Sequence, residues 1–333
     1  MKLSVIIPYC NEYPQILFTV QSIMNELNEA DFGWEIVTIN NFAPEVALQN
    51  TRRISCECGK EWHLKREEDK GGGKLASYAK THPGKLIATE YREKLSHWNA
   101  KNKGVKVSTG DILWFCDAHC SIYPRTLKKM FYCYEAEIRS RGLIGSGSLH
   151  LPLLYMMDRY SRRLVYKPVC KPENGWYSYS FTRYRPEPAP YTVAAMSTCG
   201  MMISRSLFEQ LGGWPKELGI YGGGENFINY SLSVMGKNKV IFSPSMPLIH
   251  YADRRGYSFN ASDLIRNRLI ATYMFGGEKL LRHFSKFSKG RPAVKEKMVE
   301  DILEKESEHR KLIKSQQVIG IEDWFYNFKS ELL

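Results

Sequence analysis

The alternation of hydrophobic and polar positions along the first forty residues predicts a strand, a helix and a second strand. Residues 3–8 are an apolar run rich in β-branched side chains and closed by a proline, which is typical of a buried strand. Apolar side chains then recur at helical spacing between residues 16 and 27, and residues 34–39 form a second apolar run. Because strands joined by a helix usually pair in parallel, this order predicts an α/β fold with a mostly parallel, twisted sheet flanked by helices.

The alternation continues to residue 251 after one break. Residues 43–85 lack a clear period and predict a loop-rich insert, in which Gly71-Gly72-Gly73 is expected to be a turn or hinge with no helix start behind it at phosphate-loop spacing. Helices separate the strands that follow. These strands are predicted at residues 86–89, 112–116, 143–149, 199–204, 240–242 and 247–251.

From residue 261 onward the pattern predicts helices alone. Residues 292–316 are rich in charge and predict one long, solvated helix, while Trp324, Phe325 and Phe328 are expected to hold the tail against the body. We therefore divide the chain into an α/β domain at residues 1–260 and a helical C-terminal extension at residues 261–333.

One insert in the α/β domain, at about residues 151–192, has a different composition. Aromatic and basic side chains interleave between Tyr155 and Tyr191, where acids occur only at Asp158, Glu173 and Glu187. Rings beside cations suit a surface that binds nucleic acid or sugar. A β-hairpin whose rings cover the core while its Lys and Arg side chains stay solvated explains the pattern equally well.

Charge and cysteine content narrow the class of partner and the compartment. The chain has 47 Lys and Arg against 35 Asp and Glu, a net charge of +12, which favours an anionic partner such as nucleic acid, a phosphorylated polymer or an acidic membrane surface. It has no apolar run of about 18 residues, so no transmembrane segment is expected, and its start is too short for a signal-peptide core. Eight irregularly spaced Cys favour reduced thiols. We therefore expect a cytoplasmic protein.

The central apolar run, residues 112–116, ends at the triplet Asp117-Ala118-His119. Side chains two residues apart on extended backbone point the same way, and the carboxyl ends of strands in an open α/β sheet are where ligands bind. A carboxylate with an imidazole suits Mn²⁺ or a similar cation that carries a diphosphate. The alternative is an Asp that caps the next turn beside a His with purely structural hydrogen bonds.

Polar residues stand at comparable places elsewhere. Asn11 and Glu12 follow the first strand, and Asn40 follows the second. Glu225 and Asn226 fall in the first turn of a predicted helix, where the helix dipole favours an acid in any case.

Several segments occur in a recognisable order: Ser4–Pro8 with Asn11-Glu12, Trp98–Gly104, Phe115–Cys120, and Gly213-Trp214 with Gly223–Asn226. Over roughly residues 3–260 they resemble the family 2 glycosyltransferases and, more closely, the polypeptide N-acetylgalactosaminyltransferases. The resemblance implies the GT-A (nucleotide-diphospho-sugar transferase) fold, a UDP-sugar donor and bound Mn²⁺ or Mg²⁺. Residues 1–260 would then form the catalytic domain.

The resemblance also implies roles for individual residues. The implied metal ligands are Asp117, His119 and His250. The implied donor-binding residues are Pro8, Asn11, Glu12, Asn40, Lys101, Asn102, Asp117 and Trp214. The implied catalytic residues are Glu225, Asn226, Arg254, Arg255 and Tyr257. Glu225 would orient the sugar, and the last three residues resemble a loop that closes over the diphosphate.

Three positions depart from the family patterns. Family 2 usually has Asp where His119 stands, and Asn40 stands where an Asp normally reads the nucleobase. Asn226 follows Glu225 where inverting members have an Asp that acts as base. Without that carboxylate an inverting displacement has no obvious proton acceptor, so we expect retention. We expect neither the lectin domain nor the membrane anchor of the galactosaminyl family.

The donor half does not specify the acceptor. The positive charge and the aromatic-basic insert favour DNA, with a hydroxymethylated pyrimidine flipped out of the duplex as the hydroxyl acceptor. The alternative is an enzyme that builds a surface polysaccharide, glycolipid or glycoprotein. A further alternative is a non-catalytic nucleic-acid-binding module on a transferase fold, against which Asp117, His119 and His250 argue. The sequence does not indicate an oligomeric state.

Overall fold

An eight-stranded sheet forms the centre of the protein. The computed structural model describes residues 1–43, 52–55, 62–65, 71–140, 147–157, 160–170, 179–183, 190–242, 246–251, 261–287 and 292–332. From edge to edge the sheet consists of β12 (Tyr191–Thr192), β14 (Lys239–Ile241), β8 (Ser148–His150), β13 (Met201–Ser204), β6 (Ile112–Phe115), β1 (Lys2–Tyr9), β2 (Gly33–Asn40) and β5 (Leu86–Glu90). The four strands from β6 to β5 are parallel, whereas β13 is antiparallel to both of its neighbours.

Each face of this sheet is covered by its own helices. Val5 and Ile7 point into one core with α1 (Gln15–Asn28) and α5 (Thr126–Ser140). Ile6 points into the other core with α4 (His97–Val107), α6 (Arg205–Gln210) and α7 (Gly224–Val234). Because both faces are buried, the central strands are continuous apolar runs rather than alternating ones. The predicted α/β sheet flanked by helices is confirmed.

The aromatic-basic insert contributes strands to a second sheet. This sheet has the order β11 (Tyr179–Arg183), β10 (Tyr160–Cys170), β9 (Leu153–Met157), β15 (Leu248–Tyr251) and β7 (Cys120–Ser121). β9 and β10 form an antiparallel pair, and β9 runs parallel to β15, with Tyr155 opposite His250. The insert is therefore joined to the strand that carries a predicted metal ligand.

The expectation for the glycine triplet is wrong. A helix, α3 (Gly72–Lys80), begins inside the triplet behind Gly71, whose φ is 134°. Leu75 of this helix is 1% exposed and packs into the core on the α1 side. Tertiary burial of one apolar face therefore outweighs the poor helix propensity of glycine. Upstream in the same insert, β3 (Arg52–Ser55) and β4 (Trp62–Lys65) pair antiparallel.

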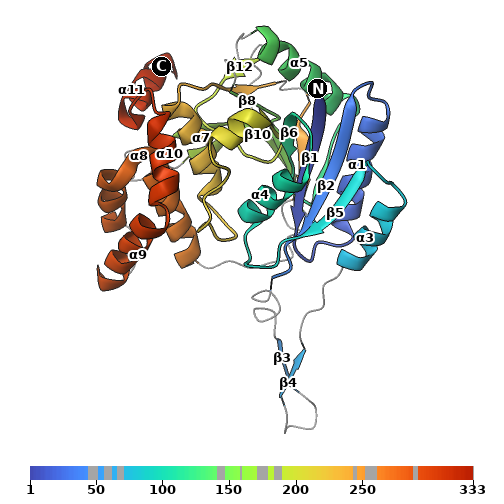
Figure 1. Cartoon of the computed structure of the whole chain (residues 1–333), viewed down its shortest axis with the longest axis horizontal. Helices are drawn as coiled ribbons and strands as arrows, with labels where there is room; N and C mark the ends of the chain where they lie inside the picture. The colour runs from blue at the N-terminus through green and yellow to red at the C-terminus, as the bar shows by residue number, and fades with distance from the viewer. Residues whose placement is uncertain are drawn as a thin grey trace.

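The expectation of one long helix over residues 292–316 is also wrong. The chain forms α8 (Ala261–Phe287), α9 (Pro292–Lys305), α10 (Ser307–Ser315) and α11 (Ile321–Leu332), which gather at the end of the molecule opposite α1 and α3 (Figure 1). α9 and α10 are separated at Glu306 and bury Val299, Ile302 and Ile313, so they are packed rather than solvated. The ring of Trp324 lies 6.2 Å from that of Tyr230 in α7, which confirms that the tail packs on the body.

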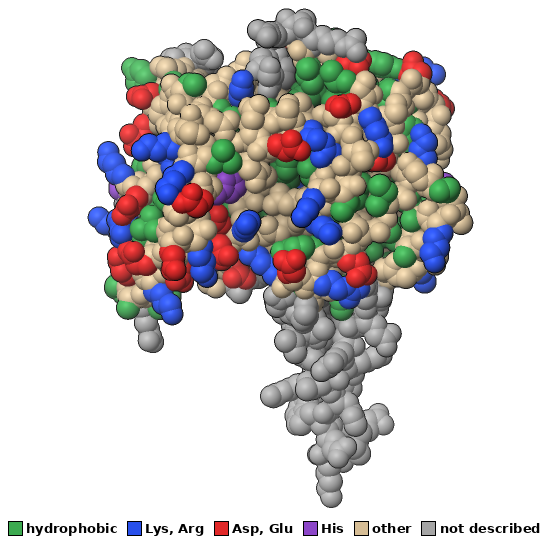
Figure 2. All heavy atoms as spheres, in the orientation of Figure 1, with side chains coloured by type: hydrophobic (Ala, Val, Ile, Leu, Met, Phe, Trp, Pro, Cys, Tyr) green, Lys and Arg blue, Asp and Glu red, His purple; other side chains and the backbone are tan. Residues whose placement is uncertain are grey.

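Charge on one face of the molecule is mixed in sign. On the face shown in Figure 2, Lys and Arg side chains alternate with Asp and Glu and do not gather into one basic patch. None of the helices within the described ranges is long and apolar enough to cross a membrane.

Candidate active site

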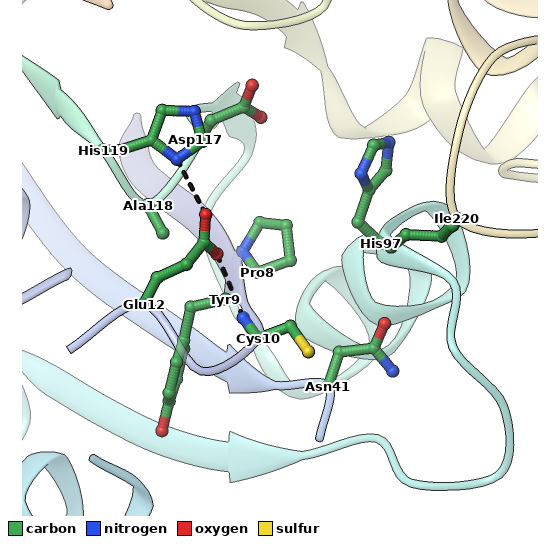
Figure 3. A pocket seen from close by; sticks show the side chains of 10 residues that line it. All are labelled: Pro8, Tyr9, Cys10, Glu12, Asn41, His97, Asp117, Ala118, His119 and Ile220. Atoms are coloured by element: carbon green, nitrogen blue, oxygen red, sulfur yellow. Dashed lines mark hydrogen bonds and ion pairs between the residues drawn. The ribbon is translucent and has the colours of Figure 1, made fainter. Parts of the chain in front are cut away.

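A pocket opens at the carboxyl ends of the central strands (Figure 3). It is lined by Pro8, Tyr9, Cys10, Glu12, Asn41, His97, Asp117, Ala118, His119 and Ile220. These residues come from the ends of β1, β2 and β6, from the start of α4 and from the segment before α7. The pocket therefore lies where the sheet topology predicts a ligand site.

The three predicted metal ligands converge beside this pocket. His250 Nε2 lies 3.2 Å from His119 Nε2 and 3.4 Å from Asp117 Oδ2. Both His side chains are 4% exposed, whereas that of Asp117 is 28% exposed. His250 reaches the triplet because β15 pairs antiparallel with β7, which places it opposite Cys120.

Glu12 determines how His119 presents its ring. Asn11 has a φ of 57°, a left-handed conformation that Asn tolerates better than most residues, and the chain turns there after β1. Glu12 Oε2 then accepts a hydrogen bond from Cys10 N at 3.0 Å, and Oε1 lies 2.8 Å from His119 Nδ1 (Figure 3). A proton on Nδ1 shared with this carboxylate leaves the Nε2 lone pair for a metal.

A helix side chain fixes the backbone of the triplet. Thr19 Oγ1 in α1 donates to Ala118 O at 2.8 Å and accepts from Cys120 N at 2.9 Å. The two hydrogen bonds of Thr19 thus attach the segment between β6 and β7 to α1. The sequence gives no sign of this role, because Thr19 belongs to an ordinary helical face.

A buried lysine pairs with Asp117. We call the three predicted metal ligands, Asp117, His119 and His250, the metal edge. Lys101 in α4 is 1% exposed, and its Nζ lies 3.5 Å from Asp117 Oδ1 and 5.0 Å from the ring centroid of Trp98. Burial opposes ionisation of Asp117, but the charge of Lys101 and the hydrogen bond with His250 outweigh it and hold the pKa of Asp117 well below its usual range. Asp117 is therefore an anion at neutral pH.

This donor set fits the implied cation. One carboxylate and two imidazole nitrogens approach one another, and Glu12 contacts His119 at Nδ1, as carboxylates behind ligating histidines do in metal sites. An oxygen and nitrogen ligand set suits Mn²⁺.

Asn102 ties α4 to the segment around Trp214. Its Nδ2 donates to Trp214 O at 2.8 Å, and its Oδ1 accepts from Trp214 N at 2.9 Å. Trp214 is 1% exposed, and its Nε1 donates to Gly224 O at 3.3 Å. Both residues therefore support the start of α7, and direct contact of either with a donor remains a prediction.

Glu225 and Asn226 occupy the first turn of α7, as predicted. Burial first, and then nearby negative charge that includes Asp117 and Glu225, raises the pKa of Tyr155. The ring of Tyr155 is 5.0 Å from the ring of His250. Tyr155 therefore lies beside a predicted metal ligand, and the charge of Glu225 at the start of α7 also acts on it.

Asn40 does not line the pocket, and the three predicted loop residues lie outside the described ranges. Asn40 is 1% exposed and caps its own turn through Oδ1, which accepts from Phe42 N at 3.1 Å. Its neighbour Asn41 lines the pocket instead, and its Nδ2 donates to Tyr91 O at 2.8 Å while its Oδ1 accepts from Ser96 N at 2.8 Å. Arg254, Arg255 and Tyr257 lie outside the described residues.

Sequence reasoning missed Cys10, Asn41 and His97 as pocket residues. Asn41 stands at a strand end, and that position could have identified it. His97 opens a helix behind the cap residue Ser96, a pattern shared by many helices without function.

Comparisons with known proteins identify the family and several relatives of this chain. The family model described as glycosyl transferase family 2 matches residues 4–212. The Caenorhabditis elegans protein named "Probable N-acetylgalactosaminyltransferase 7" is 25% identical over 272 residues, which cover 74% of this chain and 41% of that protein. The chain thus spans about two fifths of the length of this curated relative.

Solved structures share the fold. The crystal structure of GalNAc-T7 with UDP, GalNAc and Mn²⁺ aligns with a TM-score of 0.67 at 16% identity, over 100% of this chain and 57% of that chain. Residues 1–349 of S. aureus TarS in complex with UDP-GlcNAc align with a TM-score of 0.51 at 12% identity, over 92% of this chain and 73% of that chain. The predicted resemblance and the GT-A fold are confirmed.

Proposed function

Because the chain belongs to glycosyl transferase family 2, we propose that it transfers a sugar from a UDP-sugar to a hydroxyl acceptor in a metal-dependent reaction. The observation that carries the proposal is the convergence of Asp117, His119 and His250 beside a pocket at the strand ends. The solved structures that share the fold contain UDP with GalNAc and Mn²⁺, or UDP-GlcNAc, which makes UDP-N-acetylhexosamines the first donors to test.

Different residues of the chain are proposed to bind the metal, orient the sugar and close over the diphosphate. When bound, Mn²⁺ would stabilise the negative charge that develops on the diphosphate leaving group. Glu12 keeps His119 in the ligating tautomer, and Lys101 keeps Asp117 ionised. Glu225, at the start of α7, would orient the sugar. Arg254, Arg255 and Tyr257 are proposed to close over the diphosphate.

We propose that the sugar keeps its anomeric configuration. Asn226 occupies the place after Glu225 where an inverting enzyme would need a carboxylate base, and an amide cannot accept the acceptor proton. An NMR coupling constant of the product measures the anomeric configuration. An inverted product would contradict retention and require another residue to act as the base, with Asp253 as the next candidate.

The favoured acceptor is a hydroxymethylated pyrimidine in DNA. The net charge of +12 and the position of the insert support this choice, because β9 pairs with β15 and places Tyr155 beside His250. The insert is thus adjacent to the proposed reaction centre, where an acceptor must enter. Arg162, Arg163 and Arg185 of the insert are proposed to contact DNA phosphates, and their side chains lie outside the described residues.

One experiment separates donor chemistry from the acceptor. The protein is incubated with UDP-GalNAc, UDP-GlcNAc and UDP-glucose, with and without Mn²⁺, and release of UDP is measured. DNA that contains hydroxymethylcytosine or hydroxymethyluracil is then added, and the nucleosides are weighed by mass spectrometry. Mn²⁺-dependent release of UDP with no hexose or N-acetylhexosamine on DNA would support the transferase activity but contradict DNA as the acceptor. The acceptor would then be a polysaccharide, glycolipid or glycoprotein. No release from any donor would contradict the transferase itself.

A further inference from the structure

Three cysteine side chains converge directly behind the metal edge. Cys116 follows β6, Cys120 begins β7, and Cys199 lies in the turn before β13. Their Sγ atoms all lie within 4.8 Å of one another, and those of Cys120 and Cys199 are 3.6 Å apart. The residues are 0%, 2% and 3% exposed, respectively. Three separate strand ends thus bring three thiols to one point.

The spacing of these sulfurs is close to that of a thiolate metal site. Zn–S bonds of about 2.3 Å at tetrahedral angles place ligand sulfurs about 3.8 Å apart. The measured 3.6 Å between Cys120 and Cys199 already matches, and the remaining separations need to contract by at most about 1 Å. Cys120 and Cys199 already lie within hydrogen-bond distance through their sulfurs, so these two thiols face one another before any cation binds.

We propose that Cys116, Cys120 and Cys199 form a second metal site, which binds a thiophilic cation such as Zn²⁺. Each S–H bond that breaks gives its proton to solvent, and the sulfur donates its electron pair to the cation, so no oxidant or reductant is needed. Zn²⁺ takes three thiolates readily and completes its tetrahedron with one further ligand.

The pocket provides a route to the thiols. Cys199 Sγ also lies within 4.8 Å of the ligand atoms of Asp117 and His250. The side chain of Asp117 is 28% exposed, so a cation can enter through the pocket and pass Asp117 to the thiols. A water molecule that enters with the cation would serve as the fourth ligand.

Occupancy of this site would affect the metal edge. Cys116 and Cys120 directly flank the Asp117–His119 triplet, and Cys120 is paired with His250 between β7 and β15. Contraction of the sulfurs around a cation would therefore shift two of the three proposed Mn²⁺ ligands. We expect Zn²⁺ to inhibit Mn²⁺-dependent release of UDP, and this consequence alone rests on the proposed function.

The site itself can be tested without any donor. The full chain is titrated with Cd²⁺, and the thiolate-to-cadmium charge-transfer absorption is followed in the ultraviolet. We expect one equivalent of Cd²⁺ to produce the band, Cys199→Ala and Cys116→Ala each to weaken Cd²⁺ binding at least about tenfold, and Asp117→Asn to keep the band. Circular dichroism of each variant verifies folding, and the two cysteine variants give independent readings.

Cys133 provides the matched control. It is a free, partly buried cysteine in α5 outside the cluster, so Cys133→Ala should bind Cd²⁺ as the unmodified protein does. The proposal is overturned if the unmodified protein shows no band, or if the band survives in both folded cysteine variants. Loss of the band in Asp117→Asn would also overturn it, because Cys199 would then belong to the Mn²⁺ site. None of these outcomes depends on transferase activity.

Discussion

Two segments meet at Lys101 and are held in place by different forces. On one side, Lys101 pairs with Asp117 in a network that includes His119, His250 and Glu12, with contacts of 2.8–3.5 Å between ionisable groups. On the other side, Lys101 lies 5.7 Å from the ring centroid of Trp214, in a segment fixed mainly by hydrogen bonds to its backbone. Contacts between ionisable groups can rearrange when a cation or a proton binds, whereas the two hydrogen bonds from the uncharged side chain of Asn102 do not respond in this way.

The backbone contacts of the Trp214 segment come from α4, from α10 and from Glu306, which separates α9 from α10. Asn102 in α4 bonds both backbone atoms of Trp214, His309 Nε2 in α10 lies 2.6 Å from Leu211 O, and Glu306 Oε1 accepts from Glu217 N at 2.8 Å. We infer that this segment is a fixed support for the start of α7, while the metal edge is built to respond to ligand. Variants on the two sides should therefore fail in different ways.

Asp117→Asn should produce the largest effect. Removing one of two negative charges from the ligand network, and the only one paired with Lys101, should lower Mn²⁺-dependent release of UDP by at least about 100-fold. Thermal stability should also fall, because buried Lys101 loses its carboxylate partner. Asp111→Asn is the control, because Asp111 is exposed at the opposite end of β6, where it accepts from Lys2 N. Equal activity of Asp117→Asn and Asp111→Asn would remove the proposed metal edge.

Glu12→Gln should act through His119. An amide holds the imidazole less strongly than a carboxylate and permits the wrong tautomer, so the Mn²⁺ concentration for half-maximal activity should rise about 10–100-fold. Saturating Mn²⁺ should recover most of kcat, which distinguishes a positioning role from a catalytic one. Glu29→Gln, an exposed change just beyond the end of α1, should leave the Mn²⁺ curve in place. A lower kcat at an unchanged Mn²⁺ midpoint would contradict the positioning role.

Asn102→Ala should instead destabilise the fixed support. The substitution removes the two hydrogen bonds that Asn102 makes to the backbone N and O of Trp214. This loss should lower the free energy of unfolding by about 2–4 kcal/mol. Urea denaturation measures this loss, with the exposed Asn28→Ala at the end of α1 as control. A variant as stable as the control would show that the support does not depend on Asn102.

The sequence predicted the metal edge better than the support. Apolar runs that end in polar residues identify strand ends, and the parallel sheet brings strand ends together, so Asp117, His119 and Glu12 could be placed at one edge. The bond between Glu12 and His119 joins residues 107 positions apart, and the contact of Thr19 with Cys120 joins residues 101 apart. Such contacts depend on the angle of a helix on a sheet, which local periodicity does not encode.

The C-terminal helices show the same limit. The charge-rich pattern of residues 292–316 predicted a solvated helix because burial of Val299, Ile302 and Ile313 requires α8 as a partner. Glu306, at the break between α9 and α10, accepts a hydrogen bond from Glu217 N in a different part of the chain, a contact that local periodicity does not indicate. The glycine triplet before α3 was misjudged for a related reason, since Leu75 finds its core only in the folded protein.

The smallest expected effect tests whether the fixed support is truly insensitive to ionisation. Burial, together with the negative charge of Glu217, raises the pKa of Glu306 to about 7, although the hydrogen bond from Glu217 N opposes the shift. In the unfolded chain Glu306 ionises near pH 4.3, so between about pH 4.5 and 7 the folded state binds more protons than the unfolded state. Stability must therefore fall as pH rises through this window. Glu306→Gln keeps an acceptor for Glu217 N but cannot ionise, so it should remove this slope and exceed the unmodified protein by about 1–3 kcal/mol at pH 8. Urea denaturation from pH 4.5 to 8 measures the difference, and Glu304→Gln, an exposed change near the end of α9, should keep the unmodified slope. Parallel pH profiles for Glu306→Gln and Glu304→Gln would mean that ionisation of Glu306 does not act on the support.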